Sequence, residues 1–256
     1  MSVAPQVVGD PPRRGGIPIA VDALVAGIVL AGVVVALALT FFVAPRETEM
    51  GEVQRIFYMH VASAFACLVL FVTCSVASLA YLIMRAIPSQ RVLARGVDRL
   101  AHAAGEVSVV FGIVVLVTGP LWAKPAWGTY WTWEPRLTLM LLTVFLFIGY
   151  VVLRSYARAD DAGRRLAAGV AVIAGPAVYL IHVAVELWGG NHPQVVTGQG
   201  QGLESGPMAL TFAVSVAAVV LFSAYLVWMR MRHHKTAAEL ETAYLDLSDL
   251  EDQRPR

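Results

Sequence analysis

The sequence predicts an all-α integral membrane protein with six transmembrane helices and both termini in the cytoplasm. Three observations lead there: the composition, the number of apolar runs and the placement of the basic residues. Of 256 residues, 58% are apolar and 14% charged, against roughly 45–50% and 25% in a soluble domain. This excess excludes a disordered chain, a disulfide-rich secreted scaffold and an ordinary cytosolic enzyme. The net charge of +1 gives no reason to expect a nucleic-acid partner.

Six apolar runs are bounded by charged or Gly/Pro-rich segments, and a bilayer core takes about 20 apolar residues per helix. The runs cover residues 18–43, 56–84, 103–122, 137–153, 166–187 and 207–229. The first run exceeds the roughly 7–15 apolar residues of a signal peptide, so we expect a retained helix. The expected organisation is a cytoplasmic extension (1–17), a membrane domain (18–230) and a cytoplasmic tail (231–256), part of which could form an amphipathic helix.

The lysines and arginines are distributed asymmetrically about the six runs. Fifteen lie in the N-terminal segment, in loops 85–102 and 154–165, and in the tail, whereas four lie on the other side. Because basic residues remain on the cytoplasmic side of a membrane, loops 44–55, 123–136 and 188–206 are predicted to face outward. The four outward basic residues are Arg46, Arg55, Lys124 and Arg136.

Residues 122–136, W-A-K-P-A-W-G-T-Y-W-T-W-E-P-R, form an outward aromatic segment. One interpretation is an interfacial aromatic belt, but a belt would populate both membrane surfaces, and five of the six tryptophans are on the outward side. Large rigid rings bury much area and favour offset stacking, so the segment indicates a platform for a flat ligand. The candidate residues are Trp122, Trp127, Gly128, Tyr130, Trp131 and Trp133, with Trp188 in a neighbouring loop.

Two of the six histidines, His60 and His182, lie inside predicted spans. At 1.5 Å per residue they are about 7.5 and 9 Å below the outer surface. A hydrogen-bonded structural role suits either residue alone, whereas the pair at matching depth favours metal ligation, since intramembrane ionisable groups are usually functional. We expect His233 and His234 to be solvated in the tail. Cys67 and Cys74 are seven residues apart on one helix, too far apart to form a disulfide, and are expected to be small apolar fillers.

The histidine pair and the aromatic segment together suggest a haem site. Haem requires axial ligands, an apolar surface for the porphyrin and cations for its propionates. Arg55, Lys124 and Arg136 are candidates for the last role, although such residues also end helices at headgroups. Glu186 follows His182 by one helical turn and could orient an imidazole or cap the helix end; both readings stay open.

Three segments resemble the haem exporter protein C family of cytochrome c maturation. WGTYWTWEPRLT (127–138), preceded by GPLWAKPA, is similar to its tryptophan-rich WWD signature, with Glu134 and Pro135 in place of an Asp and a small residue. FYMHVASA around His60 and IHVAVELWGGNH around His182 are similar to its two histidine segments. The resemblance implies that His60 and His182 ligate haem b, non-covalently and transiently, while the aromatic segment cradles the porphyrin.

The resemblance also implies a location and partners. The protein would present haem on the periplasmic side of the inner membrane to a membrane-anchored haem chaperone, alongside an ABC transporter ATPase and membrane subunit and a small single-span subunit. This role is transfer, not catalysis. The alternatives are a b-type cytochrome subunit, which usually lacks such a loop; a haem lyase of the same superfamily, which is usually larger; and a polytopic ABC permease, which needs no paired histidines.

Overall fold

The computed structural model describes residues 19–48, 50–156, 161–192, 203 and 205–252 of the chain. It contains six long helices that are apolar enough to cross a membrane, which confirms the predicted all-α membrane fold. The helices are α1 (Ile19–Ala38), α2 (Gln54–Met84), α3 (Arg91–Trp127), α4 (Pro135–Tyr156), α5 (Asp161–Trp188) and α6 (Gly206–Asp252). A π-helix, η1 (Leu39–Val43), follows α1, and a short 3₁₀-helix, η2 (Pro88–Gln90), precedes α3.

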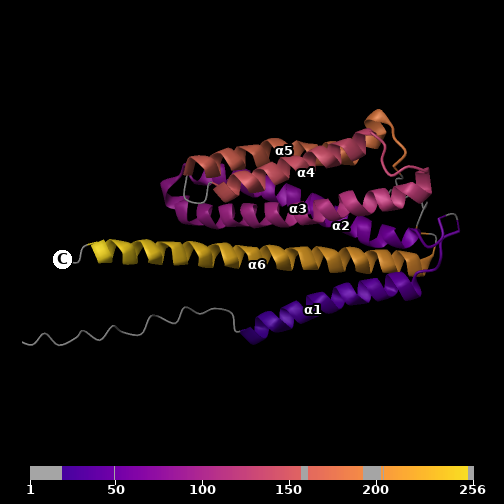
Figure 1. Cartoon of the computed structure of the whole chain (residues 1–256), viewed down its shortest axis with the longest axis horizontal. Helices are drawn as coiled ribbons and strands as arrows, with labels where there is room; N and C mark the ends of the chain where they lie inside the picture. The colour runs from indigo at the N-terminus through magenta and orange to yellow at the C-terminus, as the bar shows by residue number, and fades with distance from the viewer. Residues whose placement is uncertain (1–18, 49, 157–160, 193–202, 204, 253–256) are drawn as a thin grey trace, which may run out of the picture.

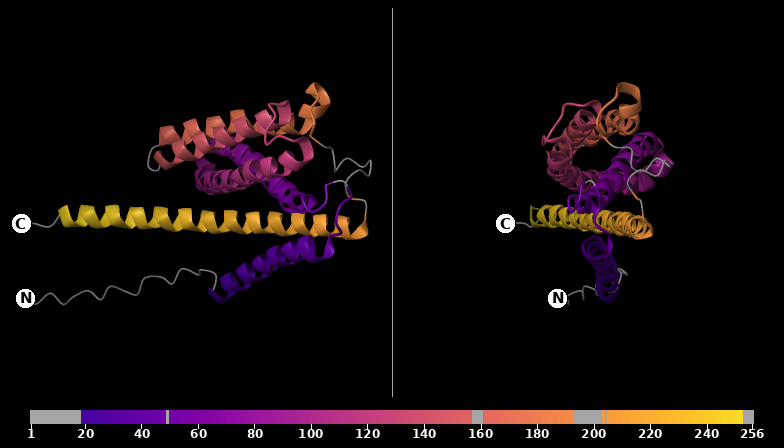
Figure 2. Two further views of the ribbon diagram at one scale, coloured as in Figure 1. Left: turned by 45° about the vertical axis from the view of Figure 1, so that its right-hand side comes forward. Right: turned by 90° about the vertical axis from the view of Figure 1, so that its right-hand side faces the viewer.

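Helices α2 to α5 form a four-helix group, and α6 packs between this group and α1 (Figure 1). Two further views show the same order, with α1 outermost (Figure 2). The aromatic segment joins α3 to α4 at one end of the bundle, which we call the aromatic end. The starts of α2, α4 and α6 and the ends of η1, α3 and α5 all lie there (Figure 1).

Small residues set the distance between α2 and α3. Three glycines of α3, seven residues apart, face three residues of α2 with the same spacing, and we call this contact the glycine seam. The α3 glycines are Gly105, Gly112 and Gly119, and their α2 partners are Cys74, Cys67 and His60. A Cβ added to these glycines would lie 3.3–3.5 Å from the α2 partner atom, and at Gly105 and Gly112 it would come even closer, 2.4 and 2.8 Å, to Tyr150 and Val144 of α4. Because lipid supplies no hydrophobic drive between helices, such close backbone approach is a main source of their packing.

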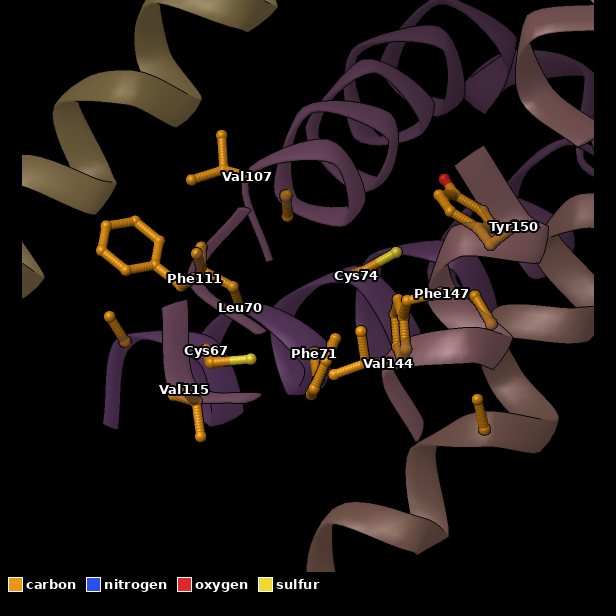
Figure 3. Close-up of a cluster of buried hydrophobic side chains, with 14 of the residues drawn as sticks. Cys67, Leu70, Phe71, Cys74, Val107, Phe111, Val115, Val144, Phe147 and Tyr150 are labelled. Carbon is orange, nitrogen blue, oxygen red and sulfur yellow. The ribbon is translucent and has the colours of Figure 1, made fainter. Parts of the chain in front are cut away.

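Aromatic rings and the two cysteines fill the core beside the glycine seam (Figure 3). Phe71 of α2 stacks on Phe147 of α4 with ring centroids 4.1 Å apart. Cys67 and Cys74 are free and fully buried, as expected of small side chains that fill the core, and the Cys67 thiol donates to the Ser108 carbonyl oxygen at 3.4 Å. Large apolar side chains elsewhere are exposed, including Phe42 at 87% and Ile173 at 80%, as expected where lipid is the solvent.

Two helices extend well past the runs that predicted them. Helix α3 begins at Arg91 rather than 103 and ends at Trp127 rather than 122, because hydropathy marks the apolar part of a helix and not its amphipathic ends. Helix α6 continues without a break from Gly206 to Asp252. The prediction of a solvated His234 was wrong: the continuing helix carries this side chain onto α3, where it is 16% exposed and bonded to Glu106.

Candidate functional site

The aromatic segment is part helix and part loop. Trp122, Lys124 and Trp127 lie on the last turns of α3, and the chain leaves the helix at Gly128. Gly128 has φ +75°, a left-handed conformation that glycine adopts without a Cβ clash at a helix C-terminus. The remaining residues form the connection to α4, which begins at Pro135. The predicted loop 122–136 is therefore anchored at both sides by rigid helices.

The indole rings pair edge to face within this segment. Trp122 and Trp127 are T-shaped with centroids 5.4 Å apart, and Trp131 and Trp133 are T-shaped at 5.8 Å. Trp133 is 76% and Tyr130 is 57% exposed, so large aromatic faces remain open. Such faces are ready to cover the apolar surface of a flat ligand.

Glu134 ties the loop to the end of α5. Its side chain is buried, and its Oε2 accepts a hydrogen bond of 2.7 Å from the backbone N–H of Asn191. Gly190 passes so close that a Cβ there would lie 2.9 Å from the same oxygen. Trp127 adds a ring contact to His192, with centroids 6.3 Å apart. The sequence left the role of Glu134 open, and the structure gives it this connecting contact.

Several buried polar atoms around the loop have no hydrogen-bond partner among the described residues. They are Trp122 Nε1, Trp131 Nε1, Thr132 Oγ1, Glu134 Oε1 and Thr138 Oγ1. Nearly all such groups in proteins are satisfied, so a cluster of exceptions marks a place where water or a ligand completes the structure. Arg136 is half-buried and likewise makes no hydrogen bond or ion pair within the described part of the chain, where Glu134 acts on it electrostatically.

His60 is held in a defined tautomer by α3. Its Nδ1 lies 2.8 Å from Thr118 Oγ1, and that oxygen lies 2.7 Å from the carbonyl oxygen of Val114. The Thr118 hydroxyl donates its single proton to the Val114 carbonyl oxygen, and in this arrangement its oxygen accepts from the Nδ1–H of His60. With these two bonds made, the proton of a neutral His60 is on Nδ1. Its Nε2 carries the lone pair that a metal requires.

His182 lies on the exposed side of α5. It is six residues before the end of α5, as His60 is six residues after the start of α2, so both are about 9 Å from helix ends. Its neighbour Ile181 is buried, whereas His182 and Glu186 are exposed. Among the described residues, neither the His182 nor the Glu186 side chain makes a hydrogen bond, and no hydrogen bond or ring pairing joins His60 to His182. The structure therefore places the two imidazoles on separate helices toward the same end of the bundle.

Arg55 joins the first helix to the second. Its guanidinium donates hydrogen bonds to the backbone oxygens of Thr40, at 3.0 Å, and Phe41, which the π-helix leaves accessible, and it pairs with Glu52. A cavity of about 540 Å³ opens beside it. The lining residues are Leu37, Thr40, Phe41, Glu52, Arg55, Ile56, Met59 and Thr118. The cavity thus reaches Thr118, the residue that holds His60.

Lys124 is also engaged within the chain. Its Nζ donates a 2.8 Å hydrogen bond to the Gly128 carbonyl oxygen and lies 5.3 Å from the centroid of the Tyr130 ring. Of the three cations proposed for an anionic ligand, Arg55 and Lys124 therefore hold the local structure. Arg136 is the one that makes no hydrogen bond or ion pair within the described residues, where Glu134 acts on its charge electrostatically.

The fold and the aromatic end define a multi-pass membrane protein that gathers indoles, imidazoles and an available guanidinium at one end of its helices. A model of the Heme exporter protein C family matches residues 8–245, and the chain belongs to this family. It is 34% identical over 198 residues to Heme exporter protein C of Escherichia coli (strain K12), covering 75% of each chain. It is 29% identical over 187 residues to the Paracoccus denitrificans protein of the same name, covering 72% of this chain and 69% of the relative.

A third relative, Heme exporter protein C of Bradyrhizobium diazoefficiens, is 30% identical over 183 residues, which are 70% of this chain and 66% of the relative. The resemblance inferred from the three motifs is thus confirmed. The family handles haem in cytochrome c biogenesis, a transport role rather than that of a named enzyme. Thr118, Gly119 and Asn191, which support the site residues, were not identified from the sequence.

Proposed function

We propose that this protein binds haem b at the extracytoplasmic face of the inner membrane, between His60 and His182, and hands it to a membrane-anchored haem chaperone. The observation that carries the proposal is the hydrogen-bond chain from His60 through Thr118 to Val114. It presents an unprotonated Nε2, the form of imidazole that ligates iron. Family membership supplies the cargo, since relatives are named for haem export.

The remaining residues have complementary roles in the proposal. The exposed His182 supplies the second axial ligand, oriented by Glu186, and the indoles of the aromatic segment cover the porphyrin. The available guanidinium of Arg136 receives a propionate, with Arg55 and Lys124 at the margins. Iron ligation between two imidazoles involves no bond making within the porphyrin, so the chain carries its cargo without chemical turnover.

Exposed rings support a transfer role. Trp133, Tyr130 and Trp188 are 76%, 57% and 56% exposed, and large aromatic side chains that stay open at one end of a protein mark an interaction surface. We infer that this surface leaves one haem edge accessible to the chaperone. The ABC transporter ATPase and membrane subunit, with a small single-span subunit, complete the proposed assembly.

Ligation is tested by imidazole rescue. His60→Gly and His182→Gly variants, purified in detergent, are expected to lose haem absorbance, and free imidazole should restore the spectrum because it refills the vacated ligand position. His233→Gly, on α6 27 residues past its start at the aromatic end, is the control and should keep its haem. Full haem retention in the double variant would refute the assignment.

Topology is tested with single cysteines. Cys67 and Cys74 are buried, so their background labelling should be low. A membrane-impermeant maleimide added to spheroplasts should label Gly206→Cys at the aromatic end and should leave Val92→Cys unlabelled until the cells are lysed. The reverse pattern would place the aromatic end in the cytoplasm and overturn the proposed site of delivery.

A further inference from the structure

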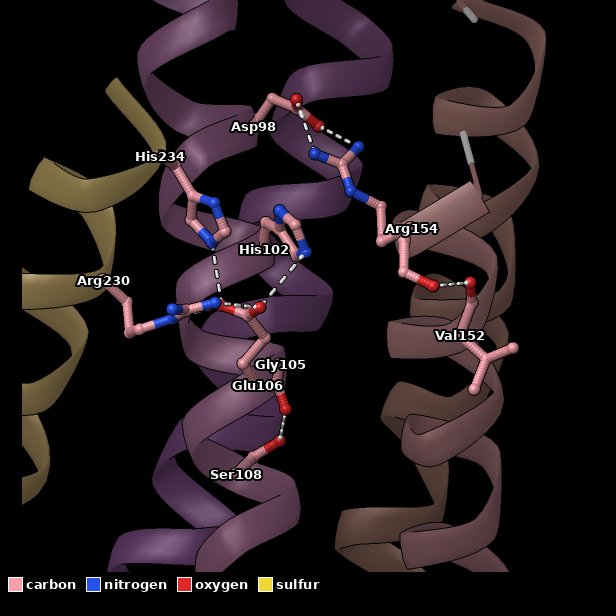
Figure 4. A network of polar contacts seen from close by, with 10 residues as sticks. Asp98, His102, Gly105, Glu106, Ser108, Val152, Arg154, Arg230 and His234 are labelled. Atoms are coloured by element: carbon pink, nitrogen blue, oxygen red, sulfur yellow. Dashed lines mark hydrogen bonds and ion pairs between the residues drawn. The ribbon is translucent and has the colours of Figure 1, made fainter. Parts of the chain in front are cut away.

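A second group of histidines lies away from the aromatic end of the bundle; Figure 4 shows its side chains from close by. His102 and Glu106 are one turn apart on α3, and His234 reaches them from α6. Glu106 is 21 residues before the end of α3, so this group is roughly 30 Å from the aromatic end. The haem site proposed above does not use it.

The three side chains converge on one point. His234 Nε2 lies 2.8 Å from Glu106 Oε2, and His102 Nε2 lies 3.6 Å from Glu106 Oε1. One ligand atom from each residue falls within 4.8 Å of the others. The imidazoles are stacked, with centroids 4.1 Å apart and an angle of 16° between planes, so both rings direct an Nε2 to the same carboxylate (Figure 4).

We propose that His102, Glu106 and His234 form a binding site for a divalent transition-metal ion of the zinc class. Two imidazoles and one carboxylate are a ligand set that Zn²⁺ accepts, with water in the fourth position. Tetrahedral zinc with bonds of about 2.1 Å spaces its ligand atoms about 3.4 Å apart, and here one ligand atom from each of the three residues already lies within 4.8 Å of the others. The side chains are 14%, 19% and 16% exposed, which leaves an entry path.

Arg230 pairs with the carboxylate of Glu106 in the structure. Its Nε and Nη2 lie 2.9 and 2.5 Å from the two oxygens of Glu106. The side chain of Arg230 is 41% exposed, so it can swing into solvent when a metal ion takes its place. The guanidinium and the metal ion compete for the same charge. Removing the Arg230 charge should therefore strengthen metal binding, an effect that a salt-bridge network without a metal site would not show.

The test is a metal titration of the full-length protein in detergent. The protein is purified with an affinity tag that contains no histidine, and bound metal is removed with a chelator before the titration. Zn²⁺ competed against a chromophoric chelator gives the affinity, and Co²⁺ absorbance reports a tetrahedral environment. We expect one ion per chain. Glu106→Gln and His234→Ala should weaken binding by more than the roughly 10–100-fold that loss of an outer-shell partner costs.

Arg230→Gln distinguishes the metal site from a salt-bridge network. Removing a charged competitor should tighten Zn²⁺ binding by about tenfold. His233→Ala keeps the tail charge but lies outside the trio and should bind as the unaltered protein does. The proposal fails if Arg230→Gln binds no stoichiometric ion, or if His233→Ala loses as much affinity as His234→Ala. If Arg230→Gln binds no ion, the cluster is an ion-pair network. If His233→Ala loses as much affinity as His234→Ala, the metal is bound by the adjacent histidines 233 and 234 instead.

Discussion

Replacing Thr118 by valine removes the hydroxyl that fixes the tautomer of His60 and keeps the shape of the side chain. In the structure this oxygen accepts the Nδ1–H of His60 at 2.8 Å while donating its own proton to Val114. In Thr118→Val the ring has no acceptor for Nδ1–H, and the proton can move to Nε2, where it blocks metal ligation.

The expected loss follows from the one bond that is removed. An unsatisfied buried donor costs about 1–2 kcal/mol, which is roughly a 5- to 30-fold weakening of haem binding. This agrees with the roughly 10–100-fold cost of losing a partner that orients a metal-ligating histidine. Haem binding is measured by titrating detergent-solubilised apoprotein and following the Soret absorbance.

Thr73→Val is the matched control. Thr73 donates to the carbonyl oxygen of Val69 at 2.8 Å, the same bond to the preceding turn, but it faces no histidine. It should leave haem affinity unchanged. Equal affinities for Thr118→Val and Thr73→Val would show that the hydroxyl does not orient His60 and would remove the main support for its role as a ligand.

Three further perturbations have defined outcomes. Gly119→Ala places a Cβ 3.3 Å from the His60 ring and should weaken haem binding several-fold. Gly149→Ala, with open space around its added Cβ, should leave haem binding unchanged, and equal titration curves for the two variants would contradict the prediction. Asp98→Ala leaves the buried Arg154 without the carboxylate to which it is bonded at 2.8 and 2.9 Å, and should lower the free energy of unfolding in SDS by about 3–5 kcal/mol. The half-exposed Asp161→Ala should lower it by less than about 1 kcal/mol, and similar losses in the two variants would refute the prediction. Glu134→Ala should loosen the aromatic loop and raise acrylamide quenching of tryptophan fluorescence, and unchanged quenching would count against the connecting role.

The six spans could be predicted because a lipid environment imposes long apolar runs on any helix that crosses it. Helix ends follow a different rule. Residues 91–102 and 230–252 are polar enough to fall outside a hydropathy window, yet they continue α3 and α6 because a helix already nucleated extends at little cost. His234 was wrongly placed in a solvated tail because the hydropathy pattern does not show that α6 continues past the apolar run.

Only part of the candidate site could be predicted from the sequence. His60, His182 and the tryptophans are rare residue types in a span or loop, so the sequence singles them out. The hydrogen bond from Asn191 to Glu134 connects residues 57 positions apart through a backbone N–H, which no side-chain pattern records. Thr118 looks like any other span threonine. The glycine seam was also not identified from the sequence, because the seven-residue spacing of its glycines does not show which helix they face.

The glycine seam restricts how the bundle can move. With interlocking contacts at every second turn, α2 cannot slide along α3 by a fraction of that repeat without steric collision. Since α2 carries His60 and α3 ends in Trp122 and Trp127, the vertical offset between the imidazole and these indoles is preserved during any rigid-body shift. If haem binds as proposed, the movement that admits and releases it involves α5, which carries His182, while α2 and α3 stay fixed relative to one another.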